Sequence, residues 1–161
     1  MTSLTHQRLL ECLDYDPETG NLLWRKTHGR AKKGQPAGNF ENGYRRISID
    51  DKQHMAHRLV WFYVYGVWPT EVDHKNGKRS DNRLENLREA TRGQNNANAQ
   101  RPSTNRSGFK GVALHTNGHY TAQITVNRKK HYLGRFSNPK EAHDVYCEAA
   151  RKYHGEFARG Q

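Results

Sequence analysis

The pair Asp73-His74 opens a polar stretch whose side chains could act on a phosphate. Residues 72–87 read VDHKNGKRSDNRLENL, and three more asparagines follow at positions 95, 96 and 98. Carboxylate and amide oxygens suit Mg²⁺, which prefers oxygen ligands and keeps several of its waters. A neighbouring imidazole could take a proton from an attacking water. The stretch therefore predicts either a solvated loop or a metal-assisted hydrolytic site.

A hairpin and a helix must position these side chains. We expect residues 72–74 to end one strand, residues 77–86 to turn, and residues 87–91 to return as a second strand. Residues 92–99 would then form a short helix packed across the hairpin.

The pleat of the first strand separates the two chemical groups. Asp73 could meet Asn95 on the helix and share a metal ion with it. His74 is the next residue, so it points to the opposite side of the strand. Asn86 would bond backbone across the turn and hold the hairpin ends together.

Several short motifs follow one another between about residues 54 and 98: HRLVW, G-x-WP, VDH, NG, DNR-x-ENLR and QNNAN. Together they resemble the HNH nuclease family, whose fold is the ββα-metal or His-Me finger. The earlier segments LDYDPETGNLLW and GYRRISI resemble the region that precedes this motif in the homing-type branch, found in phages and other mobile elements.

The resemblance assigns roles to individual residues. It implies that His74 is the general base and that Asp73 and Asn95 bind Mg²⁺ or Mn²⁺, while Asn86 is structural. Asn95 stands where the family often has His, and Asn96 and Asn98 are alternative ligands. His57 lies in an expected helix among aromatic residues, where we expect a buried structural histidine.

Composition points to small cores and a polyanionic partner. Only 33% of the 161 residues are hydrophobic, which favours two small cores over one large one. The formal net charge is +11, and residues 101–161 carry 11 basic against 4 acidic side chains. Nucleic acid is the commonest partner for such a charge, although a merely basic, ribosome-associated or RNA-binding protein would share it.

The two cysteines, Cys12 and Cys147, lie far apart and form no CxxC pair. This spacing predicts neither a cysteine-rich structural zinc site nor a disulfide framework. No apolar run approaches the roughly 18 residues of a membrane span, and no signal peptide is recognisable. We expect a soluble, cytoplasmic protein without a membrane partner, located in the host cell if it is phage-encoded.

The first hundred residues predict mixed local structure. A helix should begin at Thr5, a turn should form at residues 16–20, and strands should follow at residues 21–26 and 44–50. Residues 56–66 are apolar on most sides and end in glycine, which is typical of a buried helix.

The rest of the chain predicts a second domain. Residues 101–108, RPSTNRSG, have no apolar side chain and form the best linker candidate. Strands are expected within residues 109–115, 119–127 and 130–136. A helix should follow, capped by Asn138 and ended by Gly155, with Tyr153 in its apolar stripe.

Residues 108–158 resemble the Apetala-type DNA-binding domain of plant ethylene-response factors, through GFKGV, NGHYTAQI, HYLGRF and EAHDVYCEAARKYHGEFA. In that family a three-stranded sheet enters the major groove. Ala113 and Asn117 depart from the pattern, so the family's target sequence should not be inherited. The expected DNA contacts, including Arg128 beside the matched positions, are Lys110, His115, Asn117, Gln123, Thr125, Arg128, Lys130 and Tyr132.

The sequence thus predicts an α+β protein: an N-terminal HNH domain over residues 1–100 with its finger at about 70–100, a linker at 101–108, and a DNA-binding domain over 109–161. The resemblances imply a site-directed, homing-type endonuclease that hydrolyses double-stranded DNA with a divalent metal. A DNA-binding regulator with an inactive finger is the alternative. A monomer is the simplest expectation, and a dimer is also compatible.

Overall fold

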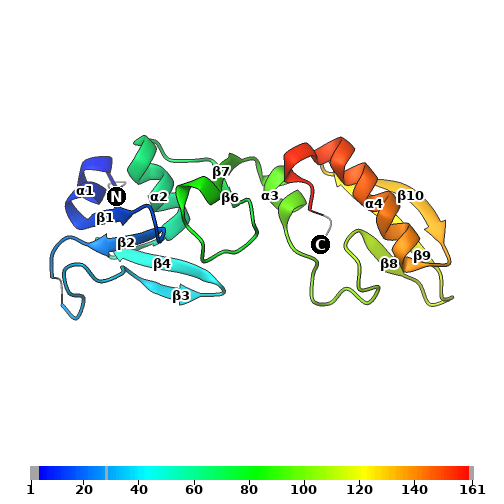
Figure 1. Ribbon diagram of the computed structural model, residues 1–161, viewed down its shortest axis with the longest axis horizontal. Coiled ribbons are helices and arrows are strands. Elements are labelled where there is room, and N and C mark those ends of the chain that lie inside the picture. The colour runs from blue at the N-terminus through cyan, green and yellow to red at the C-terminus, as the bar shows by residue number, and fades with distance from the viewer. Residues whose placement is uncertain (1–3, 28, 160–161) are drawn as a thin grey trace. The chain divides into compact units, whose positions relative to one another are not determined.

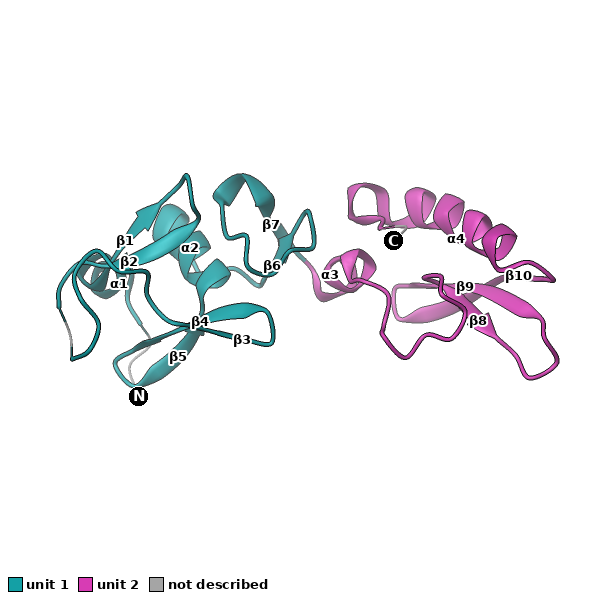
Figure 2. Cartoon of the chain, turned by 60° about the horizontal axis from the view of Figure 1, so that its bottom comes forward, with its two compact units in different colours: residues 1–90 teal, residues 91–161 magenta. Residues whose placement is uncertain are grey.

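The computed structural model describes residues 4–27 and 29–159, which form two compact units (Figure 2). Residues 1–90 belong to the first unit and residues 91–161 to the second. Helices alternate with several small antiparallel sheets, which confirms the α+β class. In the described part of the chain, no helix is long and apolar enough to cross a membrane.

The described residues of the first unit form three small antiparallel sheets, made by β1 and β2, by β3 to β5, and by β6 and β7 (Figure 2). Its elements are α1 (His6–Cys12), β1 (Leu13–Asp16), β2 (Asn21–Trp24), β3 (Asn39–Glu41), β4 (Tyr44–Ile49), β5 (Lys52–Met55), α2 (Ala56–Tyr65), β6 (Glu71–His74), the 3-10 helix η1 (Leu84–Asn86) and β7 (Leu87–Ala90).

The predicted helix ends of the first unit are confirmed. The Thr5 side chain accepts a hydrogen bond from the Arg8 N–H and starts α1. Helix α2 ends at Gly66, which adopts the left-handed conformation with φ 71° that glycine tolerates best. The two helices and the strands enclose one core, whose largest fully buried side chains are Leu9, Leu13, Leu22, Ile47, Leu59 and Val60.

The second unit is a three-stranded antiparallel sheet, in the order β10-β9-β8, covered on one face by a long helix (Figure 1). Its elements are α3 (Arg92–Asn98), β8 (Val112–Leu114), β9 (Tyr120–Val126), β10 (Lys129–Phe136), α4 (Pro139–His154) and the 3-10 helix η2 (Gly155–Phe157). Asn138 caps α4 as predicted, by accepting a hydrogen bond from the Lys140 N–H at 2.8 Å.

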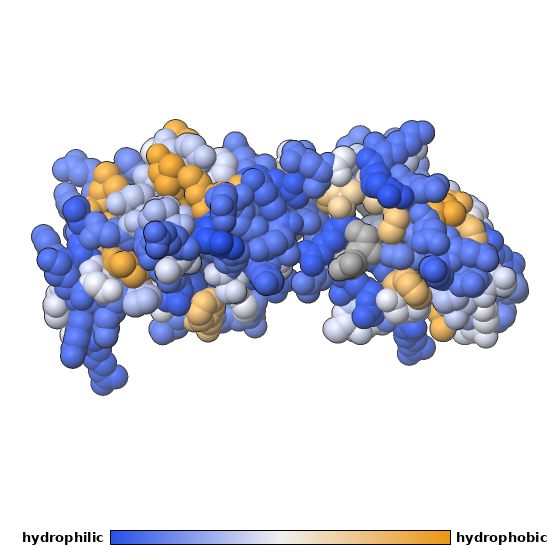
Figure 3. All heavy atoms as spheres, viewed as in Figure 1, coloured by the Kyte–Doolittle hydropathy of each residue, from blue (hydrophilic) through white to orange (hydrophobic). Residues whose placement is uncertain are grey.

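Each unit therefore has a core of its own, as the low apolar content predicts. In the second unit, Ala122 and Ile124 of β9 pack with Ala142, Tyr146 and Ala150 of α4. Hydrophilic residues cover most of the face that Figure 3 shows, with only scattered apolar ones between them.

Two details differ from the sequence-based expectation. Tyr153 is 47% exposed instead of completing the apolar stripe of α4. Residues 105–108 form an ordered loop, in which Asn105 Nδ2 and Ser107 Oγ donate to the backbone oxygens of Phe109 and Val112. A segment without apolar side chains can thus be fixed by polar ones, and the compact units divide at residue 90 instead of within residues 101–108.

Candidate active site and DNA-binding face

The β6–β7 hairpin carries the acid and the imidazole. Asp73 pairs with Arg88 and His74 pairs with Leu87 in the antiparallel register. Asp73 is 4% exposed and His74 is 5% exposed, so both sides of this short strand are covered. The predicted strand, turn and returning strand are therefore all present, and neither polar side chain belongs to a solvated loop.

Asp73 is held by a cross-strand ion pair. Arg88 Nε donates to Asp73 Oδ2 at 2.9 Å, and Arg88 Nη2 lies 2.8 Å from the same oxygen. Both side chains are largely shielded from solvent. A buried carboxylate needs such a partner, because an uncompensated charge in the interior is costly.

His74 is oriented by Asn82, which lies in the loop between the two strands. Its Nε2–H donates to Asn82 Oδ1 at 3.0 Å, and Asn82 is only 3% exposed. Since the amide oxygen can only accept, Nε2 carries the ring hydrogen and Nδ1 is the basic nitrogen. Burial lowers the pKa of His74, while its hydrogen bond to Asn82 and the negative charge of Asp73 oppose that change. The lowered pKa favours the neutral form of the imidazole.

His57 and Tyr44 pack beside the His74 ring in the interior of the first unit. The rings of His57 and His74 lie 5.0 Å apart in an edge-to-face arrangement, and the Tyr44 ring lies 5.4 Å from His57. His57 is 8% exposed, and burial lowers its pKa to about 3. His57 is therefore a buried neutral histidine, as the sequence predicts.

The loop of the hairpin is fixed by its own side chains. Asn86 Oδ1 accepts from the Asn76 N–H at 3.0 Å, and Asn86 Nδ2 donates to the Asp81 carbonyl oxygen at 2.8 Å. Arg83 pairs with the Asp81 carboxylate and lowers its pKa strongly. The Asn86 contacts are those expected of a residue that joins the two ends of the loop.

Helix α3 carries the three candidate asparagines. Thr91 begins it with a capping box, in which its hydroxyl accepts from the Gln94 N–H and the Gln94 side chain accepts from the Thr91 N–H. Asn95 is half-buried, Asn96 is exposed and Asn98 is 6% exposed. The helix is present at the predicted place.

Asp73 carries a carboxylate oxygen and Asn95 an amide oxygen, the ligand types that Mg²⁺ prefers. The two residues belong to different compact units, and a metal ion shared between them stays a prediction. Among residues 4–27 and 29–159, no three His, Cys, Asp or Glu side chains gather into a metal-binding group.

The exposed face of the C-terminal sheet brings together five of the predicted DNA contacts. Lys130 pairs with Thr125 and Tyr132 pairs with Gln123 across β9 and β10. His115 reaches the same face, because its Nε2 lies 2.9 Å from Thr121 Oγ1. All five are exposed, and α4 covers the other face of the sheet.

The other three predicted contacts lie elsewhere. Lys110 Nζ donates to the Ala97 carbonyl oxygen at 2.5 Å, and its pKa is lowered to about 8, first by burial. Asn117 Oδ1 accepts from the His119 N–H within its own turn. Arg128 sits at the tip of the β9–β10 hairpin with a positive φ of 64°. Lys110 is therefore held by a hydrogen bond within its own unit, a role that its position in the sequence does not reveal.

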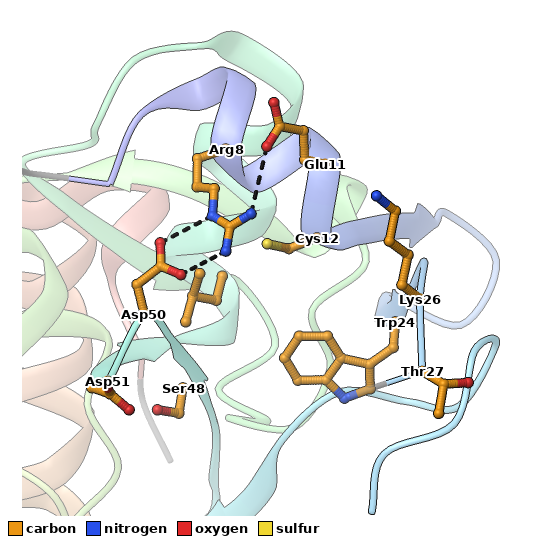
Figure 4. Close-up of a pocket in the computed structure, with 10 residues that line it drawn as sticks. Arg8, Glu11, Cys12, Trp24, Lys26, Thr27, Ser48, Asp50 and Asp51 are labelled. Atoms are coloured by element: carbon orange, nitrogen blue, oxygen red, sulfur yellow. Dashed lines mark hydrogen bonds and ion pairs between the residues drawn. The ribbon is translucent and has the colours of Figure 1, made fainter. Parts of the chain in front are cut away.

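A cavity of about 620 Å³ opens elsewhere in the first unit (Figure 4). Trp24 and Cys12 line it together with Arg8, which bonds to Asp50 and Glu11. None of Asp73, His74 and Asn82 lines this cavity. The hairpin chemistry is therefore separate from it.

The comparison with known families decides which motif this hairpin belongs to. Residues 54–97 match the HNH endonuclease family. The HNH segment thus runs from β5 to α3 and lies in the middle of the chain, not at its N-terminus as the expected domain boundaries had it. It ends before the C-terminal sheet, so the Apetala-type resemblance of that sheet stays a prediction.

A viral relative supports the same segment. An uncharacterized HNH endonuclease of Acanthamoeba polyphaga mimivirus is 30% identical over 121 residues. The alignment covers 73% of this chain and 62% of that protein. The chain therefore spans less than two thirds of the relative's length.

Sequence reasoning missed two residues of the site. Asn82 and Arg88 lie inside DNR-x-ENLR, yet only the folded loop shows that Asn82 reaches His74 and that Arg88 reaches Asp73. Strand pairing of residue 73 with residue 88 would have been the signal for Arg88.

Proposed function

We propose that the protein is a DNA endonuclease that hydrolyses phosphodiester bonds with His74 as general base. The single observation that carries this proposal is the buried His74–Asn82 hydrogen bond next to Asp73 in a hairpin that matches HNH endonucleases. A structural histidine would need no adjacent carboxylate.

The protein's own groups prepare the water for attack. His74 Nδ1 accepts the proton of the water as the new P–O bond forms, while Asn82 holds Nε2–H and keeps the ring in one tautomer. Burial favours the neutral imidazole, so the base is available at neutral pH. His57 and Tyr44 restrict the ring from the side.

Asp73 and Asn95 are the ligands that would hold Mg²⁺ or Mn²⁺ in this proposal. When bound, a divalent cation supplies positive charge that stabilises the phosphate and the departing sugar oxygen. Arg88 holds the carboxylate of Asp73 in place from the neighbouring strand. The oxygen-only donor pair supports magnesium over zinc.

The exposed sheet face is the proposed DNA-binding surface, and homing-type site preference would come from it. Lys130 would hold a phosphate, whereas Gln123 could pair with adenine. A two-stranded ribbon or a small sheet can occupy a major groove. The formal net charge of +11 supports binding that weakens steeply with salt.

Cleavage of supercoiled plasmid tests the proposal. We expect nicked or linear product with Mg²⁺ and none after EDTA is added. The alternative, a DNA-binding regulator with an inactive finger, predicts a mobility shift of the plasmid without any strand break. The buried carboxylate–imidazole arrangement favours the endonuclease, because DNA binding alone does not require it.

A further inference from the structure

We infer that the N-terminal β1–β2 hairpin (residues 13–24) positions the general base, through the backbone that carries Asn82. This inference rests on the proposed function, since it assigns the hairpin a task in the same reaction. The hairpin lies before residue 54, outside the segment that matches the HNH endonuclease family. Two contacts carry the inference.

The first contact is the hydroxyl of Tyr15 on β1. Tyr15 Oη donates to the Asn82 carbonyl oxygen at 3.3 Å and accepts from the Leu84 N–H at 2.9 Å. One side chain thereby bridges the backbone on both sides of Arg83. The half-buried hydroxyl fixes the peptide units from which the Asn82 side chain projects.

The second contact is the close approach of Gly20, at the end of the turn between β1 and β2. A Cβ atom on Gly20 would meet the backbone nitrogen of Arg83 and would lie 2.6 Å from the carbonyl carbon of Asn82. Only glycine allows the two backbones to pack this closely. Gly20 also has φ +73°, a conformation that glycine adopts without penalty.

The turn that presents Gly20 is itself rigid. Asp16 accepts from the Glu18 N–H at 3.0 Å and from the Thr19 hydroxyl at 2.5 Å, and its pKa is lowered by these bonds, that from Thr19 first. The Gly20 N–H bonds to the Asp16 carbonyl oxygen at 2.9 Å. A turn fixed by these hydrogen bonds can hold the loop that contains Asn82 in one position.

The geometry therefore forms a short series of contacts from the hairpin to the imidazole. Tyr15 and Gly20 hold the backbone at Asn82, and Asn82 Oδ1 holds His74 Nε2. Tyr15 and Gly20 are positioning residues, because neither touches the reacting atoms. The rival explanation is that the hairpin serves only the core, into which Leu13 and Leu22 are packed.

Three variants of the full chain separate these explanations. Tyr15→Phe removes the bridging hydroxyl and keeps the ring. Gly20→Ala forces the two backbones apart. Gly34→Ala is the matched control, because Gly34 has φ +79° but nothing lies within 4 Å of its added Cβ. It reproduces the backbone strain of Gly20→Ala without the clash.

Three readouts are needed. Single-turnover cleavage and DNA affinity are measured for each variant, and ¹⁵N NMR of the imidazole follows the tautomer of His74, assigned with His74→Gln. We expect Tyr15→Phe to slow cleavage about tenfold. Gly20→Ala should slow it on the order of a hundredfold. Both variants should leave DNA affinity unchanged and weaken the Nε2–H signal, whereas Gly34→Ala should match wild type in all three readouts.

The outcomes are distinct. Tyr15→Phe with a wild-type cleavage rate and a wild-type Nε2–H signal would overturn the inference, even if Gly20→Ala fails to fold. Equal losses in Gly20→Ala and Gly34→Ala would also overturn it. If wild type does not cleave DNA, the proposed endonuclease function fails, while the tautomer signal still shows whether the hairpin positions His74.

Discussion

Arg88 Nη2 lies 2.8 Å from Asp73 Oδ2, in a cross-strand pair that is almost closed to solvent. The pair brings the positive charge of Arg88 next to the carboxylate that would also bind the proposed metal ion. The guanidinium therefore holds the Asp73 carboxylate in one orientation from the neighbouring strand. Metal affinity and stability of the first unit should be coupled through this residue.

The first prediction concerns that coupling. Arg88→Met should destabilise the first unit by about 3–5 kcal/mol, because it leaves a buried carboxylate without its partner. Mg²⁺ should restore part of this loss and stabilise the variant more than wild type. Denaturation followed by tryptophan fluorescence measures it, since Trp24, Trp61 and Trp68 all lie in the first unit.

Arg25→Met provides the control for Arg88→Met. Arg25 pairs with Asp14 at 2.9 Å, but both side chains are about half exposed. Such a surface pair contributes no more than about 1 kcal/mol. Equal losses in the two variants, or no added effect of Mg²⁺ on Arg88→Met, would contradict the proposed role of Asp73.

A second prediction concerns the pH dependence of stability. Burial, and then electrostatic interactions with His74 and Arg58, lower the pKa of His57 to about 3. In the unfolded chain the pKa of a histidine is about 6.5. Between about pH 3 and pH 6.5 the unfolded state therefore binds a proton on His57 that the folded state does not bind. Above about pH 6.5 the contribution of His57 to the free energy of unfolding is fully present. As the pH drops below 6.5, His57 lowers the free energy of unfolding by up to about 1.4 kcal/mol per pH unit.

His57→Gln should flatten this pH dependence. Urea denaturation between pH 5 and pH 7, again followed by tryptophan fluorescence, gives the slope for wild type and variant. His6→Gln, at a half-buried histidine of the same unit, is the control. A slope that His57→Gln leaves unchanged would show that His57 is not the neutral buried group described above.

The third prediction tests the sheet face with two neighbouring lysines. Lys130 pairs with exposed Thr125, whereas Lys129 pairs with Val126, which packs toward α4, so the two lysines point to opposite faces. Lys130→Ala should reduce the slope of log Kd against log salt concentration by about 1, because one phosphate contact is lost. Lys129→Ala should change this slope less. The reverse order would place DNA on the other face.

Much of the local structure could be predicted from the sequence. The helix that ends at Gly66, the hairpin of residues 71–90 and the cap at Asn138 all follow from local patterns, because turn residues, caps and apolar periodicity act over a few positions. The HNH segment was recognisable for the same reason, since its motifs are short and ordered.

The features that could not be predicted from the sequence depend on contacts between residues that are far apart in the chain. Tyr15 and Asn82 are 67 residues apart, and nothing in either segment shows that they meet. From the sequence alone Lys110 resembles a phosphate contact. In the structure its ammonium donates a hydrogen bond to the Ala97 carbonyl oxygen. Residues 101–108 resemble a linker because the side chains that fix residues 105–108 are polar.

The identity of the base is tested most directly by His74→Ala in the plasmid assay with Mg²⁺. Wild type should nick or cut supercoiled DNA, and EDTA should stop it. His74→Ala should give no product while its affinity for DNA stays within a few-fold of wild type, because the imidazole acts on water and not on DNA binding. Normal cleavage by His74→Ala would contradict the assignment of His74 as the general base.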